Sequence, residues 1–169
     1  MMARFVTIMM GSDSDLPLVE NTINVLKSFA IETRVRVASA HRTPDEAAAI
    51  VQQAEAEGCQ VFICAAGLAA HLAGAVAART TRPVIGIPVD GGPLNGVDAL
   101  YSTVQMPGGI PVATVAIGKA GAKNAGFLAA QIMALSDPEL DAKVKADRKQ
   151  AAAAVVAKDK ALQDKLNAQ

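Results

Sequence analysis

Short apolar runs alternate along the chain with longer stretches that mix apolar and polar residues. The short runs are rich in β-branched residues and end at glycine or at polar loops, which is typical of buried strands. The longer stretches have helical spacing or are rich in alanine. Strands are therefore predicted at residues 4–10, 33–37, 60–64, 83–89 and 111–117, and helices at residues 16–29, 44–57, 72–79, 97–104 and 120–135.

This alternation predicts an α/β fold with a parallel sheet covered on both faces, because strands that are apolar throughout are buried on both sides. Right-handed crossovers favour a three-layer α/β/α, doubly wound architecture. Five strands favour the flavodoxin-like order 2-1-3-4-5. The alternating segment Thr33–Val37 is expected near an edge of this sheet. Thr43 and Glu46 form a capping-box pattern at the start of the second helix.

The last part of the chain has a different pattern. Ser136 or Asp137 can cap a helix that starts at Pro138. The larger apolar residues that follow form two interleaved series, each with a period of eleven residues. This period keeps one narrow apolar stripe nearly straight along a helix. We therefore divide the chain into an α/β domain, residues 1–135, which is expected to carry the functional site, and a C-terminal helical arm, residues 136–169. The arm either packs on the body or a neighbouring subunit, or is a solvated helix that frays. The stripe consists of Leu140, Val144, Ala151, Val155, Leu162 and Leu166.

Composition excludes several classes of function. The formal net charge is zero and aromatic residues make up 3% of the chain, so neither the basic surface nor the stacking residues of a nucleic-acid binder are present. No apolar run reaches the roughly 18 residues of a membrane span, and no secretory leader is recognisable. We expect a cytoplasmic protein that binds neither membrane nor nucleic acid.

The same composition predicts self-association. Hydrophobic residues make up 51% of a chain of 17.3 kDa, and a body of that size leaves much apolar surface exposed, which favours a homo-oligomer. Cys59 and Cys64 lie in or beside one apolar strand, too far apart to bridge, and are expected to be core residues. With only two histidines and no His/Cys cluster, no metal site is expected.

Candidate chemistry lies in the loops that follow the first three strands, because ligands of open parallel sheets bind at the carboxyl ends of the strands. Both histidines fall in these loops. The loops are Gly11-Ser-Asp-Ser-Asp15, Ser39-Ala-His-Arg42 and Ala66-Gly-Leu-Ala-Ala-His71.

The first loop places hydroxyls and backbone N–H groups at the start of a helix, where they can hold a phosphate. It lacks the Gly-Lys-Ser/Thr ending of a nucleoside-triphosphate loop. Its carboxylates suit ribose hydroxyls, which are hydrogen-bond donors. The alternative is that Ser14 or Asp15 merely caps the helix.

The second and third loops carry the histidines. His41 can exchange a proton near neutral pH, and Arg42 is a permanent donor suited to phosphate or carboxylate. In the third loop, Ala66, Gly67 and Ala69 are small enough for a ligand to approach the backbone. His71 is expected at the start of the next helix. Each residue also has a purely structural alternative. His41 would then be a hydrogen-bonded loop residue, Arg42 a surface cation, and His71 a packing or capping residue.

These motifs resemble those of the class I N5-carboxyaminoimidazole ribonucleotide mutases, the phosphoribosylaminoimidazole carboxylase catalytic subunit family. The resemblance covers residues 4–135 and is specific because several motifs occur in order. They are Met10–Asp15, Ser39–Asp45, Ala69–Leu72, Ser102–Val112 and Ala116–Ala125.

The resemblance implies a cofactor-free isomerase of purine biosynthesis, usually a homo-octamer, that moves a carboxylate from N5 to C4 of a ribonucleotide. It makes His41 the catalytic histidine and assigns Ser12, Asp15 and Arg42 to the ribose and phosphate. Around the imidazole and the carboxylate it places Ser39, Ala66, Gly67, Ala69, His71 and Leu72. Gly11, Asp13 and Ala40, which stand inside the same motifs, complete the expected substrate-binding set.

The third loop departs from the family pattern. Leu68 replaces a glycine and Ala73 a proline, and a leucine at positive φ would be strained. The carboxyl source is therefore in question, since related class II enzymes use aminoimidazole ribonucleotide and free CO2. Those enzymes lack the Ala-Ala-His signature.

Two other classes of protein are disfavoured. A receiver domain would need an aspartate at the end of the third strand, where this chain has Ala65-Ala-Gly67. A flavin module would need aromatic walls for the ring, and the chain has one Tyr and no Trp. A noncatalytic nucleotide-binding scaffold is harder to separate from an enzyme.

Overall fold

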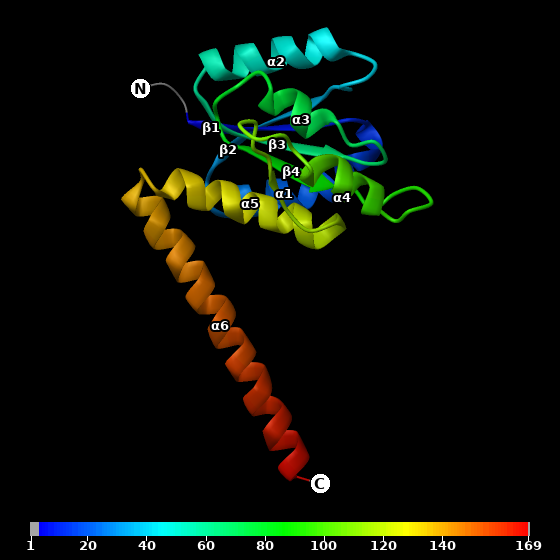
Figure 1. Cartoon of the computed structure of the whole chain (residues 1–169). Coiled ribbons are helices and arrows are strands. Elements are labelled where there is room, and N and C mark those ends of the chain that lie inside the picture. The colour runs from blue at the N-terminus through cyan, green and yellow to red at the C-terminus, as the bar shows by residue number, and fades with distance from the viewer. Residues whose placement is uncertain (1–3, 169) are drawn as a thin grey trace.

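The computed structural model describes residues 4–168 and shows a parallel sheet with helices on both faces and one long helix extending from the body (Figure 1). Residues 1–3 of the predicted α/β domain and residue 169 of the predicted C-terminal arm lie outside the described residues. The strands are β1 (Phe5–Met10), β2 (Glu32–Val37), β3 (Cys59–Ala66), β4 (Val84–Pro88) and β5 (Ala113–Thr114). The helices are α1 (Leu16–Ser28), α2 (Pro44–Ala56), α3 (Leu72–Ala77), α4 (Val97–Val104), α5 (Gly118–Ala134) and α6 (Pro138–Asn167).

The sheet has the order β2-β1-β3-β4-β5 and every pairing is parallel, as the sequence predicts. Met10 at the end of β1 pairs with Val37 and with Ala65. Ala66 at the end of β3 pairs with Pro88. The carboxyl ends of four strands therefore stop at one edge, and the loops that follow them start side by side.

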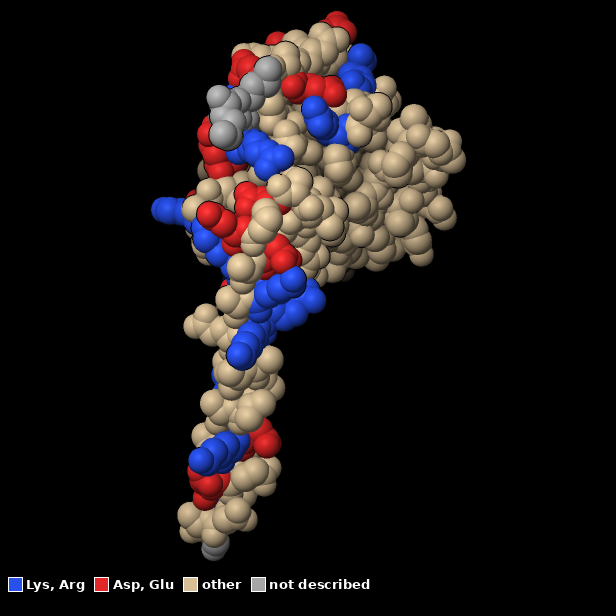
Figure 2. All heavy atoms as spheres, turned by 90° about the vertical axis from the view of Figure 1, so that its left-hand side faces the viewer, with Lys and Arg blue, Asp and Glu red and all other residues tan. Residues whose placement is uncertain are grey.

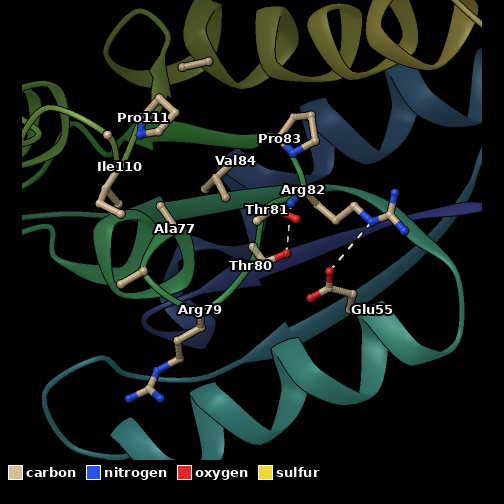
Figure 3. Close-up of a pocket in the computed structure, with 13 residues that line it drawn as sticks. Glu55, Ala77, Arg79, Thr80, Thr81, Arg82, Pro83, Val84, Ile110 and Pro111 are labelled. Carbon is tan, nitrogen blue, oxygen red and sulfur yellow. Dashed lines mark hydrogen bonds and ion pairs between the residues drawn. The ribbon is translucent and has the colours of Figure 1, made fainter.

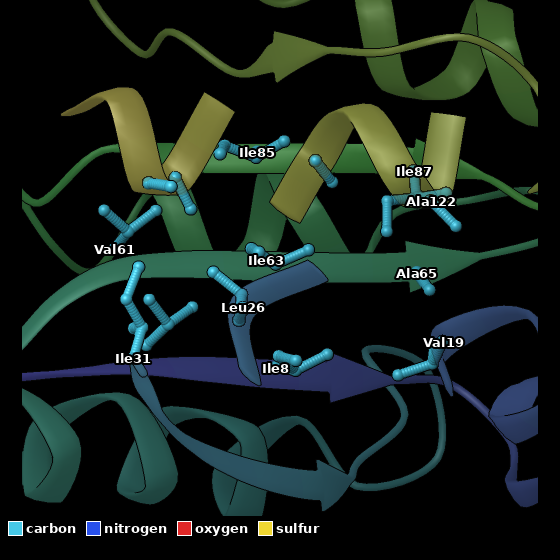
Figure 4. Close-up of a cluster of buried hydrophobic side chains, with 14 of the residues drawn as sticks. Ile8, Val19, Leu26, Ile31, Val61, Ile63, Ala65, Ile85, Ile87 and Ala122 are labelled. Atoms are coloured by element: carbon cyan, nitrogen blue, oxygen red, sulfur yellow. The ribbon is translucent and has the colours of Figure 1, made fainter. Parts of the chain in front are cut away.

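Two apolar cores lie on the two faces of this sheet. One face is covered by α1 and α5, whose side chains pack on Ile8, Ile63 and Ile85 (Figure 4). The other is covered by α2 and α3, which pack on Met9 and Phe62. Burial on both faces is the reason that β1, β3 and β4 are apolar at nearly every position.

Small residues let α5 approach α1 closely. A Cβ on Gly126 would lie 2.8 Å from Cβ of Val25, so only glycine fits there. The buried hydroxyl of Thr22 donates to the carbonyl of Ala122 at 2.6 Å. The alanine-rich composition of this helix thus comes from close packing of two helices on one face of the sheet.

Two local predictions are wrong. The predicted strand at 111–117 pairs only through Ala113 and Thr114, because Pro111 has no N–H to donate and the chain turns into α5 at Gly118. Thr43 makes no side-chain cap at α2. Its hydroxyl instead donates to the carbonyl oxygen of Ser39 at 3.2 Å and accepts from the Ser39 N–H at 3.0 Å.

The long helix α6 is capped as predicted, since the carboxylate of Asp137 accepts from the N–H of Leu140 at 3.0 Å. Leu140 is buried and Val144 packs beside it on the α1–α5 core. The rest of the stripe is exposed, with Val155, Leu162 and Leu166 more than half accessible. Thirty residues at 1.5 Å per residue make a helix of about 45 Å, most of which extends away from the body (Figure 1).

Candidate active site

A cavity of about 540 Å³ opens at the carboxyl edge of the sheet, among the loops after β1, β2, β3 and β4. Hydrogen bonds that continue the sheet into these loops fix their spacing. The N–H of Gly11 donates to the carbonyl of Ala65 at 3.2 Å, and that of Val89 to Ala66 at 2.9 Å. The cavity is lined by Gly11, Ser12, Ser14, Asp15, Ser39, Ala40, His41, Arg42, Ala66, Gly67, Leu68, Ala69, His71, Leu72, Val89, Gly91 and Gly92.

The loop after β1 is stabilised by its own hydroxyl groups. Ser12 Oγ accepts from the backbone N–H of Ser14 at 3.3 Å and from Ser14 Oγ at 2.8 Å. Asp15 stands at the N-cap position of α1, yet its carboxylate makes no capping hydrogen bond. Burial raises the pKa of Asp15, partly offset by a hydrogen bond from the Ser12 backbone, and the nearby charge of Asp13 raises it further. Asp15 is thus a partly desolvated acceptor on the cavity wall, not a helix cap.

The loop after β2 is organised around Ser39. Ser39 Oγ accepts from the backbone N–H groups of His41 and Arg42, at 3.3 and 3.2 Å. This turn holds both residues at the cavity while their side chains remain exposed. Within residues 4–168, the guanidinium of Arg42 has no ion-pair or hydrogen-bond partner, so its donors are available to an anionic ligand.

The two histidines of the chain meet in this cavity. Nε2 of His41 lies 2.7 Å from Nδ1 of His71, which is hydrogen-bonding distance. The ring centroids are 4.7 Å apart and the planes are inclined by 63°. His71 stands at the N-cap position of α3, where the sequence predicts it. The sheet order explains the meeting, since β2 and β3 flank β1 and their loops converge over its end.

The loop after β3 has the strained backbone that its sequence suggests. Leu68 has φ +55°, a region that costs a residue with a Cβ roughly 1–2 kcal/mol. A Cβ on Gly92, in the loop after β4, would lie 2.5 Å from Cδ2 of Leu68. The leucine side chain therefore lies directly over Gly92.

The structure brings together every residue that the sequence places in the site except Asp13. That carboxylate is exposed and accepts from Ser12 Oγ at 3.3 Å. Sequence reasoning missed the loop after β4, although it too follows the carboxyl end of a strand, and it treated Leu68 only as a departure. The lining residues that were not predicted are Ser14, Leu68, Val89, Gly91 and Gly92.

A larger cavity, of about 790 Å³, lies at the amino ends of β4 and β5 (Figure 3). Its only carboxylate, Glu55, is 3.9 Å from Nε of Arg82, and Arg79 points away from that pair. Neither histidine is near it. The acid/base chemistry of the described residues is thus concentrated in the smaller cavity.

Within residues 4–168, no group of three or more His, Cys, Asp or Glu side chains is placed to hold a metal ion. Cys59 and Cys64 are buried and unpaired, and burial raises the pKa of both thiols. None of the helices in the same range combines the length and apolarity that crossing a membrane requires.

Comparison with known proteins agrees with this geometry. The family model described as AIR carboxylase matches residues 5–154. The N5-carboxyaminoimidazole ribonucleotide mutase of Thermotoga maritima is 53% identical over 140 residues, which cover 83% of this chain and 81% of that protein. The enzyme of the same name from Synechocystis is 57% identical over 139 residues, 82% and 78% of the two chains.

Solved structures show the same fold. The crystal structure of Treponema denticola PurE superimposes with a TM-score of 0.82 at 33% identity, covering 90% of this chain and 94% of that one. A second structure from that organism gives a TM-score of 0.86 at 33% identity, covering 94% and 97%. The flavodoxin-like order and the long C-terminal helix of the described residues are therefore part of a known architecture.

Proposed function

The chain belongs to the AIR carboxylase family, and we propose that it is an isomerase of purine biosynthesis that converts N5-carboxyaminoimidazole ribonucleotide to 4-carboxyaminoimidazole ribonucleotide. The relatives that carry the mutase name are about half identical to it over four fifths of its length. The observation that carries the proposal is the hydrogen-bonded pair of His41 and His71 inside a cavity that also presents Asp15 and Arg42.

We assign the proton transfers to His41. It donates a proton to the carbamate nitrogen, the N–C bond breaks with its electron pair remaining on nitrogen, and CO2 is released. C4 of the electron-rich imidazole then attacks CO2 and forms the new C–C bond. The C4 proton returns to His41, so one imidazole acts as acid and then as base with no net proton change.

The remaining lining residues suit the rest of the substrate. Asp15 and Ser12 offer acceptors for ribose hydroxyls, and Arg42 offers a bidentate donor for the phosphate. The predicted role of Asp13 loses support, because its carboxylate is not on the cavity wall.

The small residues of the cavity suit the CO2 step. Ala66, Gly67 and Ala69 leave room for the imidazole ring and for CO2 beside it, which holds the two reactants close together. We retain Gly11, Ser39, Ala40, His71 and Leu72 as substrate-binding positions because each lines the same cavity. Its volume of about 540 Å³ lies within the range of small-molecule sites.

Substrate discrimination by the purified protein tests the proposal. Conversion of the C4-carboxylated ribonucleotide is followed by absorbance, and forward assays use either the N5-carbamate or aminoimidazole ribonucleotide with bicarbonate. Turnover of the carbamate without added bicarbonate is expected. Turnover only with bicarbonate would mean direct carboxylation, and nucleotide binding without any turnover would leave a noncatalytic scaffold.

We further propose that the protein works as a homo-oligomer, with an octamer as the size that family resemblance implies. Helix α4 and the loop before it expose a stripe at helical spacing: Leu94, Val97, Tyr101 and Val104. Asp98 is the only charged residue between positions 91 and 118, and Figure 2 shows a broad uncharged surface on one side of the body. Contiguous apolar surface of this kind is typical of an interface. A monomer mass in solution at micromolar concentration would contradict this.

We place the enzyme in the cytoplasm. Its proposed substrate and product are phosphorylated, and charged nucleotides do not cross membranes unaided, so the enzyme is expected where these intermediates are made.

A further inference from the structure

The loops after β3 and β4 touch each other at the cavity through Leu68 and Gly92. Both residues have positive φ, +55° and +68°. The Leu68 side chain occupies the place that a Cβ on Gly92 would need, with Cδ2 at 2.5 Å from it. A side chain at position 92 would therefore have to displace the tip of Leu68 from this place. The contact links the loop after β3 to the loop after β4.

Leu68 differs from the other large apolar residues that line the cavity, Leu72 and Val89. Leu72 is 2% exposed and Val89 is half-buried, whereas Leu68 is 55% exposed. A leucine that is both strained and accessible is not explained by core packing. Strained residues persist only where the surrounding structure over-determines their conformation, and they are frequent at functional sites.

The proposed reaction has a step at which an exposed apolar residue on the cavity wall, such as Leu68, is useful. Between cleavage of the N–C bond and formation of the C–C bond, the carboxyl group exists as CO2, which is small and uncharged. No ion pair can retain it, so attack by C4 competes directly with escape into water. An apolar side chain at the wall of the cavity restricts both the exit of CO2 and the entry of water.

We propose that Leu68, held on Gly92, retains the released CO2 and so determines how often the carboxyl group leaving nitrogen is the same one that reaches C4. This inference rests on the proposed function. It makes Leu68 a specificity-determining residue that separates internal transfer from carboxylation by dissolved CO2. His41 and Arg42 keep their proposed roles unchanged.

Label exchange during a single turnover tests the inference. Enzyme in excess is mixed with unlabelled N5-carbamate in buffer containing ¹³C-bicarbonate and carbonic anhydrase, then quenched within the first turnover. The fraction of product carrying ¹³C is measured by mass spectrometry, after subtraction of an enzyme-free control. The unmodified protein is expected to incorporate little label, because CO2 stays in the cavity.

Label incorporation is compared between the unmodified protein and four variants. Leu68→Gly, which removes the side chain, is expected to raise label incorporation about threefold or more, and Gly92→Ala, which displaces that side chain, to raise it in the same direction. Leu68→Met keeps an apolar side chain of similar size and is expected to stay within about twofold of the unmodified protein. Leu135→Gly makes the same chemical change at a leucine that is 89% exposed and outside the cavity, and should match the unmodified protein.

Each outcome is decisive. Equal incorporation in Leu68→Gly and the unmodified protein, with both turning over, would overturn the role of Leu68 and leave the proposed function intact. Absence of carbamate turnover in the unmodified protein would refute the proposed function, and the retention of CO2 with it.

Discussion

Nε2 of His41 faces Nδ1 of His71 at 2.7 Å, a distance that allows one hydrogen atom between the two rings and not two. One ring has to donate and the other has to accept, so the pair can carry at most one positive charge while this contact is made. The contact thus fixes the protonation of one imidazole relative to the other. This coupling suits a site in which a single proton leaves the enzyme and later returns.

Replacement of His41 by Asn should abolish most turnover while preserving nucleotide binding. Asn keeps a hydrogen-bonding group of similar reach but cannot exchange a proton near neutral pH, and loss of general acid/base catalysis typically costs about 10² to 10⁴ in rate. Steady-state kinetics with the carbamate and calorimetric binding of the C4-carboxylated product measure the two properties separately. Near-native kcat in His41→Asn would remove His41 from the chemistry.

Two substitutions at His71 should separate its orienting hydrogen bond from its bulk. The amide of Asn can place a polar atom close to the position of Nδ1, whereas Ala leaves His41 Nε2 without this partner. We expect kcat to fall by about tenfold or more in His71→Ala and by less in His71→Asn, as for a lost hydrogen bond that positions a catalytic group. Equal losses in both variants, with an unchanged pH profile, would show that His71 only fills space.

The sequence predicts this pair in part. Strands buried on both faces are apolar throughout, so they can be recognised in the sequence. His41 and His71 both follow the carboxyl ends of strands, which places them at the same edge of the sheet. Their hydrogen bond is not predictable, because it depends on how the loop after β2 folds around Ser39. The capping-box pattern at Thr43 was misleading there, since the hydroxyl had a nearer partner in Ser39.

The length of β5 and the loop after β4 illustrate a different limit. An apolar run at 111–117 looks like a strand in sequence, but Pro111 has no N–H to donate to the sheet, and the chain already turns into α5 at Gly118. Gly91 and Gly92 have no side chain to signal a role. Only the structure shows that both glycines line the cavity and that the side chain of Leu68 lies over Gly92.

A double-mutant cycle should show that Leu68 and Gly92 are energetically coupled. Gly92→Ala alone is expected to lower the free energy of unfolding by about 1–3 kcal/mol, because alanine is strained at the positive φ of position 92 and its Cβ must displace the tip of Leu68. In a Leu68→Gly background the clash is gone, and only the backbone cost remains. The loss should then be smaller by about 0.5 kcal/mol or more. Chemical denaturation of the four proteins measures the cycle, and additive losses would contradict the contact.

Replacement of Asp15 by Asn should stabilise the unliganded protein at neutral pH. The folded-state pKa of Asp15 is raised, mainly by burial, so its contribution to stability is present below the unfolded pKa, near 3.9, and is lost as pH rises through the folded pKa. At pH 7 the variant should therefore be more stable by no more than about 1 kcal/mol, because the side chain is partly exposed and screened. The difference should vanish near pH 3.

Denaturation curves at pH 7 and pH 3 check the sign. Asp13→Asn is the matched control, with an exposed carboxylate outside the cavity, and should change stability less. Asp15→Asn should also weaken nucleotide binding by about tenfold, since a charged acceptor is replaced by a neutral one. A variant less stable than the unmodified protein at pH 7 would mean that the carboxylate stabilises the loop.

Two leucines on α6 offer a matched pair for the role of the arm. Leu140 and Leu162 belong to the same eleven-residue series, but Leu140 is 6% exposed against the body and Leu162 is 52% exposed. Leu140→Ala should cost about 2–4 kcal/mol, as for a buried leucine. Leu162→Ala should change stability by less than about 0.5 kcal/mol if solvent surrounds it. A loss at Leu162 that grows with protein concentration would instead mean that a second copy covers the arm, since association contributes to stability by mass action.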